Sequence, residues 1–159
     1  MPLAIIAAVA KNNVIGKRNA LPWYIPEDLK RFKLLTTGKT VLMGRKTSDS
    51  IIQNLGKPLP NRKNVVITSQ SDYRVPDGVV VYNNLKKALE ELKNEEVMVS
   101  GGGEIYKQTI DFAEKLYITH VDKEVDGDVF FPEIDSNKWK KISEEKHEGF
   151  SFTEYERIR

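Results

Sequence analysis

The sequence predicts a single α/β domain: an open, doubly wound, mostly parallel sheet with helices on both faces. Continuous apolar runs such as Leu3–Ala10 and Val97–Ser100 are typical of parallel strands that are buried on both faces. Amphipathic helical patterns separate most of these runs, as in successive strand–helix–strand units. A chain of 159 residues can bury one core, so we expect one domain over residues 1–159.

The elements of the parallel part can be placed in chain order. Its strands are expected at Leu3–Ala10, Thr40–Met43, Asn64–Thr68, Val79–Tyr82 and Val97–Ser100. Its helices are expected at Pro26–Leu35, Lys46–Ile52, Leu85–Lys93 and Glu104–Phe112. Pro26 suits the first turn of a helix, where its missing N–H has no partner to lose. The third helix carries an apolar stripe at helical spacing, which we interpret as core.

The last third of the chain changes character. Lys115–Val121, Lys138–Glu145 and Phe150–Arg157 are strand-like segments with no helices between them. We therefore expect them to finish the sheet antiparallel, with a C-terminal hairpin at its edge. Ligands of open α/β sheets bind outside the carboxyl ends of the strands, so the polar loops that follow the strands are the candidate binding region.

The composition excludes several classes of protein. The net charge of +2 is small and the signs are well mixed, which argues against a nucleic-acid partner. There is no cysteine, which excludes disulfides and thiolate chemistry and agrees with a reducing cytoplasm. Leu3–Ala10 has no basic segment before it and is too short to span a bilayer, so a buried strand is preferred over a signal peptide.

Asp28 is the first candidate for chemistry, because it lies just inside the helix that begins at Pro26. Asp28 and Phe32 are four residues apart and share a helix face, with Leu29 beside them. An acid in this place is either a ligand-binding group or a partner for the positive end of the helix dipole. The local sequence leaves both interpretations open.

Two predicted strand-to-helix junctions have features of phosphate binding. The run Gly101–Gly103 allows a phosphate to approach the backbone where a helix begins. The junction Gly44–Thr47 adds two cations and a hydroxyl at another helix start. Arginine is unfavourable near the positive end of a helix dipole, so an anionic partner is indicated. Arg45 with Ser69 is suited to a further phosphate, such as the one that distinguishes NADPH from NADH.

Other candidates are ambiguous from the local sequence. Arg62 follows a proline turn and is either a fork for a carboxylate or a surface charge. His120 and His147 lack metal-type spacing, so no metal site is expected. Trp23 and Tyr106 are by residue type more often core or rim aromatics than site groups.

A set of short motifs extends along the whole chain. They are Ile5–Ala8, Val14–Gly16, Asn19–Trp23, Ile25–Leu29, Phe32, Met43–Thr47, Pro58–Arg62, Gly101–Gly103, Tyr106, Leu116–Thr119, Gly127–Asp128 and Phe131–Pro132. In this order they resemble the dihydrofolate reductases of the bacterial chromosomal type, and the ordered set is highly specific. The resemblance implies the dihydrofolate reductase fold over the whole chain.

The resemblance implies reduction of dihydrofolate to tetrahydrofolate by hydride transfer from NADPH, as part of one-carbon metabolism. It implies a cytoplasmic monomer that binds dihydrofolate and antifolate inhibitors, with no nucleic-acid or membrane partner. The catalytic residues implied are Asp28, Trp23, Leu21 and Thr119. Asp28 would hold the pterin ring in a paired hydrogen bond and favour its protonation through water. Activity is therefore expected to fall as pH rises.

The family pattern also implies contact residues. Those for the substrate are Ile6, Ala8, Asp28, Leu29, Phe32, Lys33, Ser50, Ile51, Lys57, Leu59, Arg62, Ser100, Tyr106 and Thr119. Those for the cofactor are Ala8, Val14, Ile15, Gly16, Asn19, Ala20, Leu21, Gly44, Arg45, Lys46, Thr47, Thr68, Ser69, Gln70, Gly101, Gly102, Gly103, Glu104, Ile105 and Tyr106. Arg62 would hold the glutamate tail. Val14–Leu21 resembles a mobile loop over the nicotinamide, and Gly127-Asp128 resembles the loop that latches it.

The chain departs from the family pattern in a few places. Ile52–Leu55 is inserted beside the expected folate-tail site. Ser100 replaces a usual apolar residue, and Ser100–Lys107 is similar to plasmid-borne members with poor trimethoprim sensitivity. Two other interpretations stay open: the same-fold reductase domain of riboflavin synthesis, and a catalytically silent nucleotide- or pterin-binding module. Asp28, Thr119 and the Val14–Trp23 loop are intact, which favours the enzyme.

Overall fold

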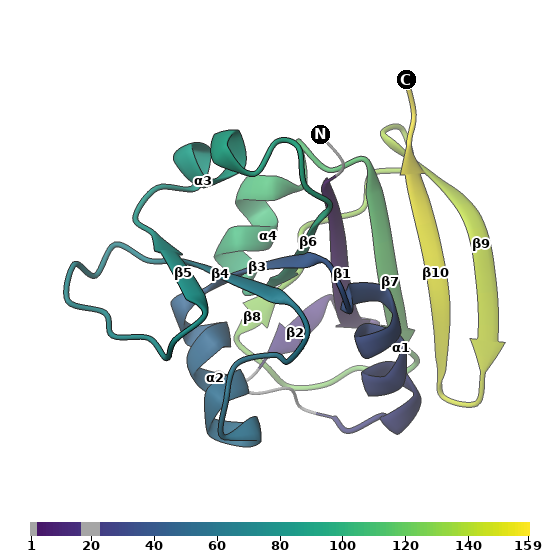
Figure 1. The fold of residues 1–159 in the computed structure, drawn as a ribbon. Helices are drawn as coiled ribbons and strands as arrows, with labels where there is room; N and C mark the ends of the chain where they lie inside the picture. The colour runs from purple at the N-terminus through teal and green to yellow at the C-terminus, as the bar shows by residue number, and fades with distance from the viewer. Residues whose placement is uncertain (1–2, 17–22) are drawn as a thin grey trace.

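The computed structural model describes residues 3–16 and 23–159. Its centre is an eight-stranded sheet with the strand order β5-β4-β3-β6-β1-β7-β10-β9, and a separate pair is formed by β2 and β8. Helices cover both faces of the large sheet (Figure 1). The predicted α/β fold is confirmed. None of the helices in the described ranges has the length and apolar character needed to cross a membrane.

The elements follow the predicted ranges to within a few residues. The strands are β1 (Leu3–Ala10), β2 (Val14–Gly16), β3 (Thr40–Gly44), β4 (Lys63–Ile67), β5 (Val79–Tyr82), β6 (Val97–Gly101), β7 (Lys115–Val121), β8 (Val129–Phe130), β9 (Trp139–His147) and β10 (Phe150–Arg157). The helices are α1 (Pro26–Thr36), α2 (Arg45–Leu55), α3 (Leu85–Glu91) and α4 (Gly103–Thr109).

Antiparallel pairing begins one strand later than the sequence predicts. β7 pairs in parallel with β1, and β10 is the first strand to run antiparallel to its neighbour. The reason is that α4 lies between β6 and β7 and provides a helical crossover, which parallel strands require. β9 and β10 then form the expected hairpin at the edge of the sheet.

Helix α2 absorbs the four residues that are inserted relative to the family pattern. It continues through Ile52–Leu55, where the sequence predicted an end at Ile52. Gly56 follows with φ of 75°, the left-handed conformation that ends many helices and that glycine adopts without strain. The insertion therefore lengthens α2 before the proline turn.

Two apolar clusters on opposite faces of the sheet hold the helices in place. The larger one joins strands β1, β6 and β7 to Leu89 of α3 and Ile105 of α4. The smaller one joins Met43 and Val66 to Phe32 of α1 and Ile51 of α2. Successive side chains of a strand point to opposite sides of the sheet, so one strand contributes residues to both clusters.

Asn64 at the start of β4 fixes the proline turn to the sheet. Its side chain accepts a hydrogen bond from Leu59 N at 3.0 Å and donates to Leu59 O at 2.9 Å and Arg62 O at 3.1 Å. Asn64 is buried, so these backbone groups cannot turn to water if the amide is removed.

We expect Asn64→Leu to lower the free energy of unfolding by about 2–4 kcal/mol, because it leaves buried polar groups of the turn unpaired. Urea denaturation of the two proteins measures this difference. Asn83→Leu, at an exposed position, is the matched control and should change it by about 0.5 kcal/mol or less. An equal loss in both variants would contradict the role given to Asn64.

Candidate active site

The loops that follow β1, β3, β4, β6 and β7 meet at one edge of the sheet, because these strands are parallel. Ala8 of β1 is paired with Thr119 of β7, and Met43 of β3 is paired with Gly101 of β6. Most of the candidate residues lie on or near this edge, where ligands of open α/β sheets bind.

Asp28 of α1 is held by Thr119 of β7. The Thr119 hydroxyl donates to Asp28 Oδ1 at 2.5 Å, across 91 positions of the chain. Thr119 is buried and Asp28 is partly buried. A role as partner of the helix dipole does not by itself explain this arrangement. The Thr119 hydroxyl comes from β7 and fixes one oxygen of the Asp28 carboxylate. The second oxygen, Oδ2, takes no part in this bond.

Burial raises the pKa of Asp28, while the hydrogen bond from Thr119 and the charge of Arg31 lower it. Arg31 follows Asp28 by nearly one helical turn. Its guanidinium lies 4.5 Å from the centre of the Phe152 ring, and its Nη2 lies 3.9 Å from Oε1 of Glu154. Strand β10 therefore anchors a half-buried cation beside the acid.

We expect Arg31→Gln to raise the pKa of Asp28 further, because it removes a nearby positive charge. The fall of activity with rising pH should then move to higher pH, because the proton that depends on the Asp28 site is retained to a higher pH. The profile of kcat/KM against pH measures the shift. Lys30→Gln, an exposed position on the same helix, should leave the profile unchanged. A profile that moves to lower pH in Arg31→Gln would contradict the electrostatic role.

Other predicted pterin-site residues come from β1, β6 and α4. Tyr106 is buried and donates through its hydroxyl to Ile6 O at 2.7 Å. Burial and the charge of Asp28 both raise the pKa of the Tyr106 phenol, so this group stays a donor. Ile6 and Ala8 alternate with fully buried neighbours on β1 and are partly exposed. Buried polar atoms of Ser100 and Trp23, Oγ and Nε1, have no hydrogen-bond partner among the described residues.

The predicted apolar wall is brought together by the smaller core cluster. Phe32 of α1 and Ile51 of α2 pack against this cluster, which includes buried Leu59 of the proline turn. Leu29 is 50% exposed. Ser50 is partly buried, whereas Lys33 and Lys57 are exposed.

Arg62 is oriented by oxygens of two neighbouring segments. Its Nε donates to Pro60 O at 2.8 Å and its Nη1 to Thr36 Oγ1 at 3.1 Å, while its guanidinium carbon lies 6.0 Å from the centre of the Phe32 ring. Burial lowers the pKa of Arg62. Both acceptors are neutral, so the charge is held in place without being neutralised by them. This favours the carboxylate fork over a free surface charge.

The starts of α2 and α4 lie against each other. A Cβ on Gly44 would lie 3.9 Å from Gly102 N and 3.3 Å from Ile105 Cγ1. A Cβ on Gly101 or Gly102 would lie 3.2 or 3.4 Å from Thr47 Oγ1. The residues that precede the two helices, Gly44 and Gly102, offer no side-chain cap to the first N–H groups. The first N–H groups of both helices are thus uncapped by side chains where the sequence predicted phosphate binding, and a pyrophosphate fits this donor set.

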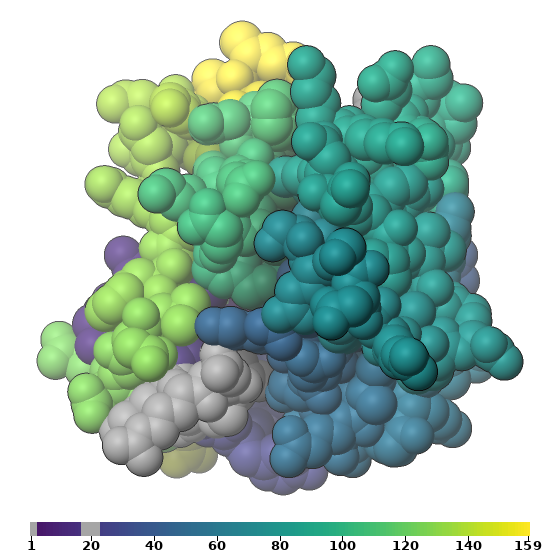
Figure 2. Space-filling model, turned by 90° about the vertical axis from the view of Figure 1, so that its left-hand side faces the viewer, coloured from purple at the N-terminus to yellow at the C-terminus, as the bar shows by residue number. Residues whose placement is uncertain are grey.

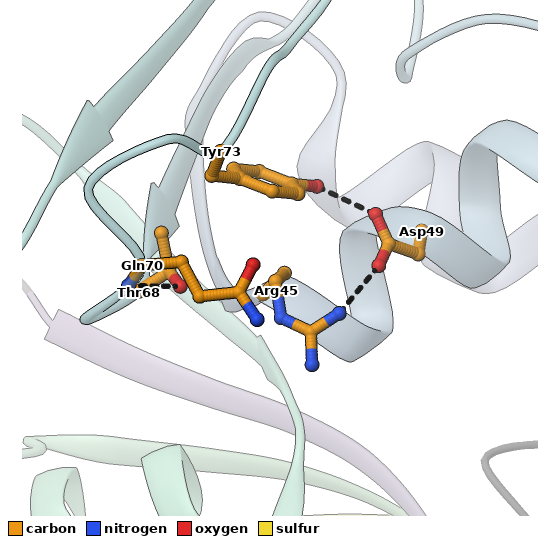
Figure 3. Close-up of polar contacts among 5 residues, drawn as sticks. All are labelled: Arg45, Asp49, Thr68, Gln70 and Tyr73. Carbon is orange, nitrogen blue, oxygen red and sulfur yellow. Dashed lines mark hydrogen bonds and ion pairs between the residues drawn. The ribbon is translucent and has the colours of Figure 1, made fainter.

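Arg45 lies beside the turn that follows β4 and contains Thr68 and Gln70 (Figure 3). Its Nη1 is 3.0 Å from Oδ2 of Asp49, one turn further along α2. Gln70 N donates to Thr68 Oγ1 at 3.1 Å, which shapes the turn after β4. The other predicted residues of this region, Lys46, Ser69 and Glu104, are exposed. Glu104 accepts a hydrogen bond from Gln108.

The two loops compared with a mobile loop and its latch are in contact. Asp128 N donates to Gly16 O at 3.1 Å, and Phe131 N donates to Asn13 O at 2.8 Å. Between these bonds, Val14 of β2 pairs with Phe130 of β8 and Gly16 pairs with Val129. The predicted contacts Asn19, Ala20 and Leu21 lie outside the described residues.

The sequence analysis missed two charged residues of this region. Arg31 stands three residues after Asp28, and Asp49 stands four residues after Arg45, so helical spacing alone placed each beside a predicted site residue. The residues that the structure describes contain no group of three histidine or acidic side chains arranged for a metal ion.

The chain is similar to known proteins over most of its length. A family model described as dihydrofolate reductase matches residues 2–157. Dihydrofolate reductase HdrB of Haloferax volcanii is 42% identical over 160 residues, covering 96% of this chain and 82% of that protein. Dihydrofolate reductase of Bacillus subtilis is 43% identical over 145 residues, covering 91% and 83%. The solved structure of dihydrofolate reductase from Enterococcus faecalis, complexed with NADP(H) and RAB-propyl, superposes with a TM-score of 0.85 at 36% identity, covering 99% of this chain and 96% of that one.

Proposed function

The chain belongs to the dihydrofolate reductase family, and on this basis we propose how its residues reduce 7,8-dihydrofolate to 5,6,7,8-tetrahydrofolate with NADPH. The observation that carries the proposal is the partly buried carboxylate of Asp28, fixed by Thr119 at 2.5 Å. It stands at the same edge of the sheet as the glycines of the cofactor region. This arrangement supports one binding region that combines the acid with a phosphate cradle.

Asp28 binds and orients the pterin ring. Its carboxylate accepts hydrogen bonds from the ring's amino group and the adjacent ring nitrogen, and each charge-assisted bond contributes roughly 1.5–3 kcal/mol. Thr119 keeps one oxygen in place, so the orientation of the ring is defined before the reaction. A negative charge at this point also favours protonation of the ring nitrogen beside the carbon that is reduced, with the proton arriving through water. The unpartnered Nε1 of Trp23 is suited to hold such a water.

The remaining substrate contacts fall into two groups. Phe32, Ile51 and Leu59 provide an apolar wall for the middle of the substrate. Arg62, oriented by Thr36 and Pro60, holds the carboxylate of the glutamate tail.

NADPH supplies the hydride when it is bound. Gly101, Gly102 and Gly103 let its pyrophosphate reach the free N–H groups at the starts of α2 and α4. Arg45 and the turn after β4 hold the additional phosphate of the adenosine end. The paired strands β2 and β8 exclude water from one side of the reacting region.

We extend the proposal to the chain as a whole. Residues 1–159 form a single dihydrofolate reductase domain that acts as a cytoplasmic monomer and binds dihydrofolate and antifolate inhibitors. The absence of cysteine from the sequence supports a reducing compartment.

The test is the loss of NADPH absorbance when dihydrofolate is added to the protein. Rapid loss that depends on both compounds supports the proposal. NADPH binding without turnover would favour the catalytically silent module of the same fold. Turnover of a pyrimidine precursor of riboflavin in place of dihydrofolate would favour the other reductase.

A further inference from the structure

Both carboxylate oxygens of Asp49 are engaged by different parts of the chain. Oδ2 lies 3.0 Å from Nη1 of Arg45, and Oδ1 accepts a hydrogen bond from the Tyr73 hydroxyl at 2.7 Å (Figure 3). Arg45 and Asp49 come from the first turns of α2, whereas Tyr73 comes from the segment between β4 and β5. The carboxylate is therefore held in one orientation, directed at the guanidinium.

Tyr73 strengthens this arrangement. Burial and its hydrogen bond to Asp49 both raise the pKa of the Tyr73 phenol, and a weaker contribution from Ser48 opposes them. The phenol thus remains a donor across the physiological range.

The Arg45–Asp49 pair is expected to contribute little to the stability of the fold. The two side chains are 31% and 48% exposed, and ion pairs of this kind at helical spacing contribute little to stability. In Figure 2 the start of α2 (blue) reaches the surface between α4 (green) and the teal surface around β5, which is the region assigned to the adenosine end of the cofactor. The pair thus stands at a binding surface.

We propose that Asp49 is a specificity-determining residue that weakens the hold of Arg45 on the extra phosphate of NADPH, and so reduces the preference for NADPH over NADH. This inference rests on the proposed function, because it takes Arg45 as the phosphate ligand. Asp49 neutralises part of the arginine charge, and it repels a phosphate on the far side of the same guanidinium. For a dianion about 7 Å from the carboxylate, Coulomb's law in water gives an affinity lower by roughly 3- to 10-fold.

Asp49→Asn tests the inference, because asparagine removes the charge and keeps nearly the same shape. Its one oxygen can accept from Arg45 while its amide nitrogen donates to the Tyr73 hydroxyl oxygen, which can act as an acceptor. We measure the Kd of NADPH and of NADH for the protein by fluorescence titration in low salt, without substrate. The expected result is binding of NADPH that is 3- to 10-fold tighter, with NADH changed by less than 2-fold. The gain should shrink in 0.5 M salt, because exposed charges are then screened.

Two further variants separate the possible failures. Asp111→Asn makes the same change in net charge at an exposed position beyond α4, and equal tightening there would overturn the inference. Arg45→Gln tests the premise: if it leaves NADPH binding intact, Arg45 does not hold the phosphate and the cofactor assignment is wrong. If Arg45→Gln weakens NADPH binding while Asp49→Asn leaves it unchanged or weaker, the assignment stands and the role of Asp49 is overturned.

Discussion

Asp28→Asn is expected to lower kcat/KM for dihydrofolate by about 100-fold or more at neutral pH. Asparagine can still accept a hydrogen bond from Thr119, so the position of the side chain is retained. It cannot supply the negative charge that favours protonation of the pterin ring, and it offers one acceptor where the ring presents two donors. Steady-state turnover followed by NADPH absorbance measures the loss.

Loss of folding does not explain such a result, and the sign of the pKa shift shows why. Burial raises the pKa of Asp28, so the folded state favours the protonated carboxyl. The stability that this provides is fully present below the ordinary pKa of an aspartate and is lost as pH rises through the raised pKa. At neutral pH the ionised Asp28 side chain therefore lowers the stability of the folded state. The Asp28→Asn variant should melt at the same temperature as the native protein or at a higher one.

Glu27→Gln is the matched control for this experiment. Glu27 is the exposed neighbour of Asp28 in the same helical turn, so the variant removes an equal charge at the helix start. We expect less than a 3-fold change in kcat/KM, because Glu27 is exposed, whereas Asp28 is partly buried and bonded to Thr119. If Asp28→Asn keeps turnover within this range, Asp28 is not the acid of the reaction.

Gly101→Ala is expected to weaken NADPH binding by about 10- to 100-fold. Gly101 has φ of 132°, where residues with a Cβ are strained, typically by about 1–3 kcal/mol. Its new methyl group would also lie 3.2 Å from Thr47 Oγ1 and 3.5 Å from the Tyr106 hydroxyl. The strained φ and the close contact with Thr47 favour a shift of this backbone, which is the proposed cradle for the pyrophosphate. Fluorescence titration with NADPH measures the effect.

Gly78→Ala separates backbone strain from the loss of the site. Gly78 also has a positive φ, 89°, but a Cβ there would meet nothing within 4 Å. This variant should lose stability and keep its affinity for NADPH. If the native protein and Gly101→Ala bind NADPH with equal affinity, the assignment of this glycine run to the cofactor site is wrong.

The fold could be predicted largely because its parallel strands are buried on both faces. Strand β1 and strand β6 are continuous apolar runs, and such runs have few structural alternatives in a chain of this size. The short pair β2 and β8 was not predicted as a sheet, since its three and two residues carry too little pattern. β7 runs parallel to β1 because α4 provides the crossover before it. The sequence prediction considered only the strands of the last third, which have no helices between them.

The site was predictable in part for a different reason. Asp28 alone was ambiguous, and the ordered motifs supplied its partner Thr119, which is 91 positions away. Arg31 and Asp49 belong to no motif used in the prediction. Their effect depends on tertiary contacts with Glu154 and Tyr73, and no local pattern reveals which strand or loop will stand opposite a helix.

The position of β10 between β7 and β9 determines when β9 can join the sheet as the chain is synthesised. β9 is made first, yet its partner in the sheet is β10, which is made after it. Until residues 150–157 have left the ribosome, residues 139–147 have no strand to pair with. Their many lysines and glutamates then keep a waiting, unpaired edge from joining another nascent chain. The cation that β10 places beside Asp28 is therefore fixed only in the last step of assembly.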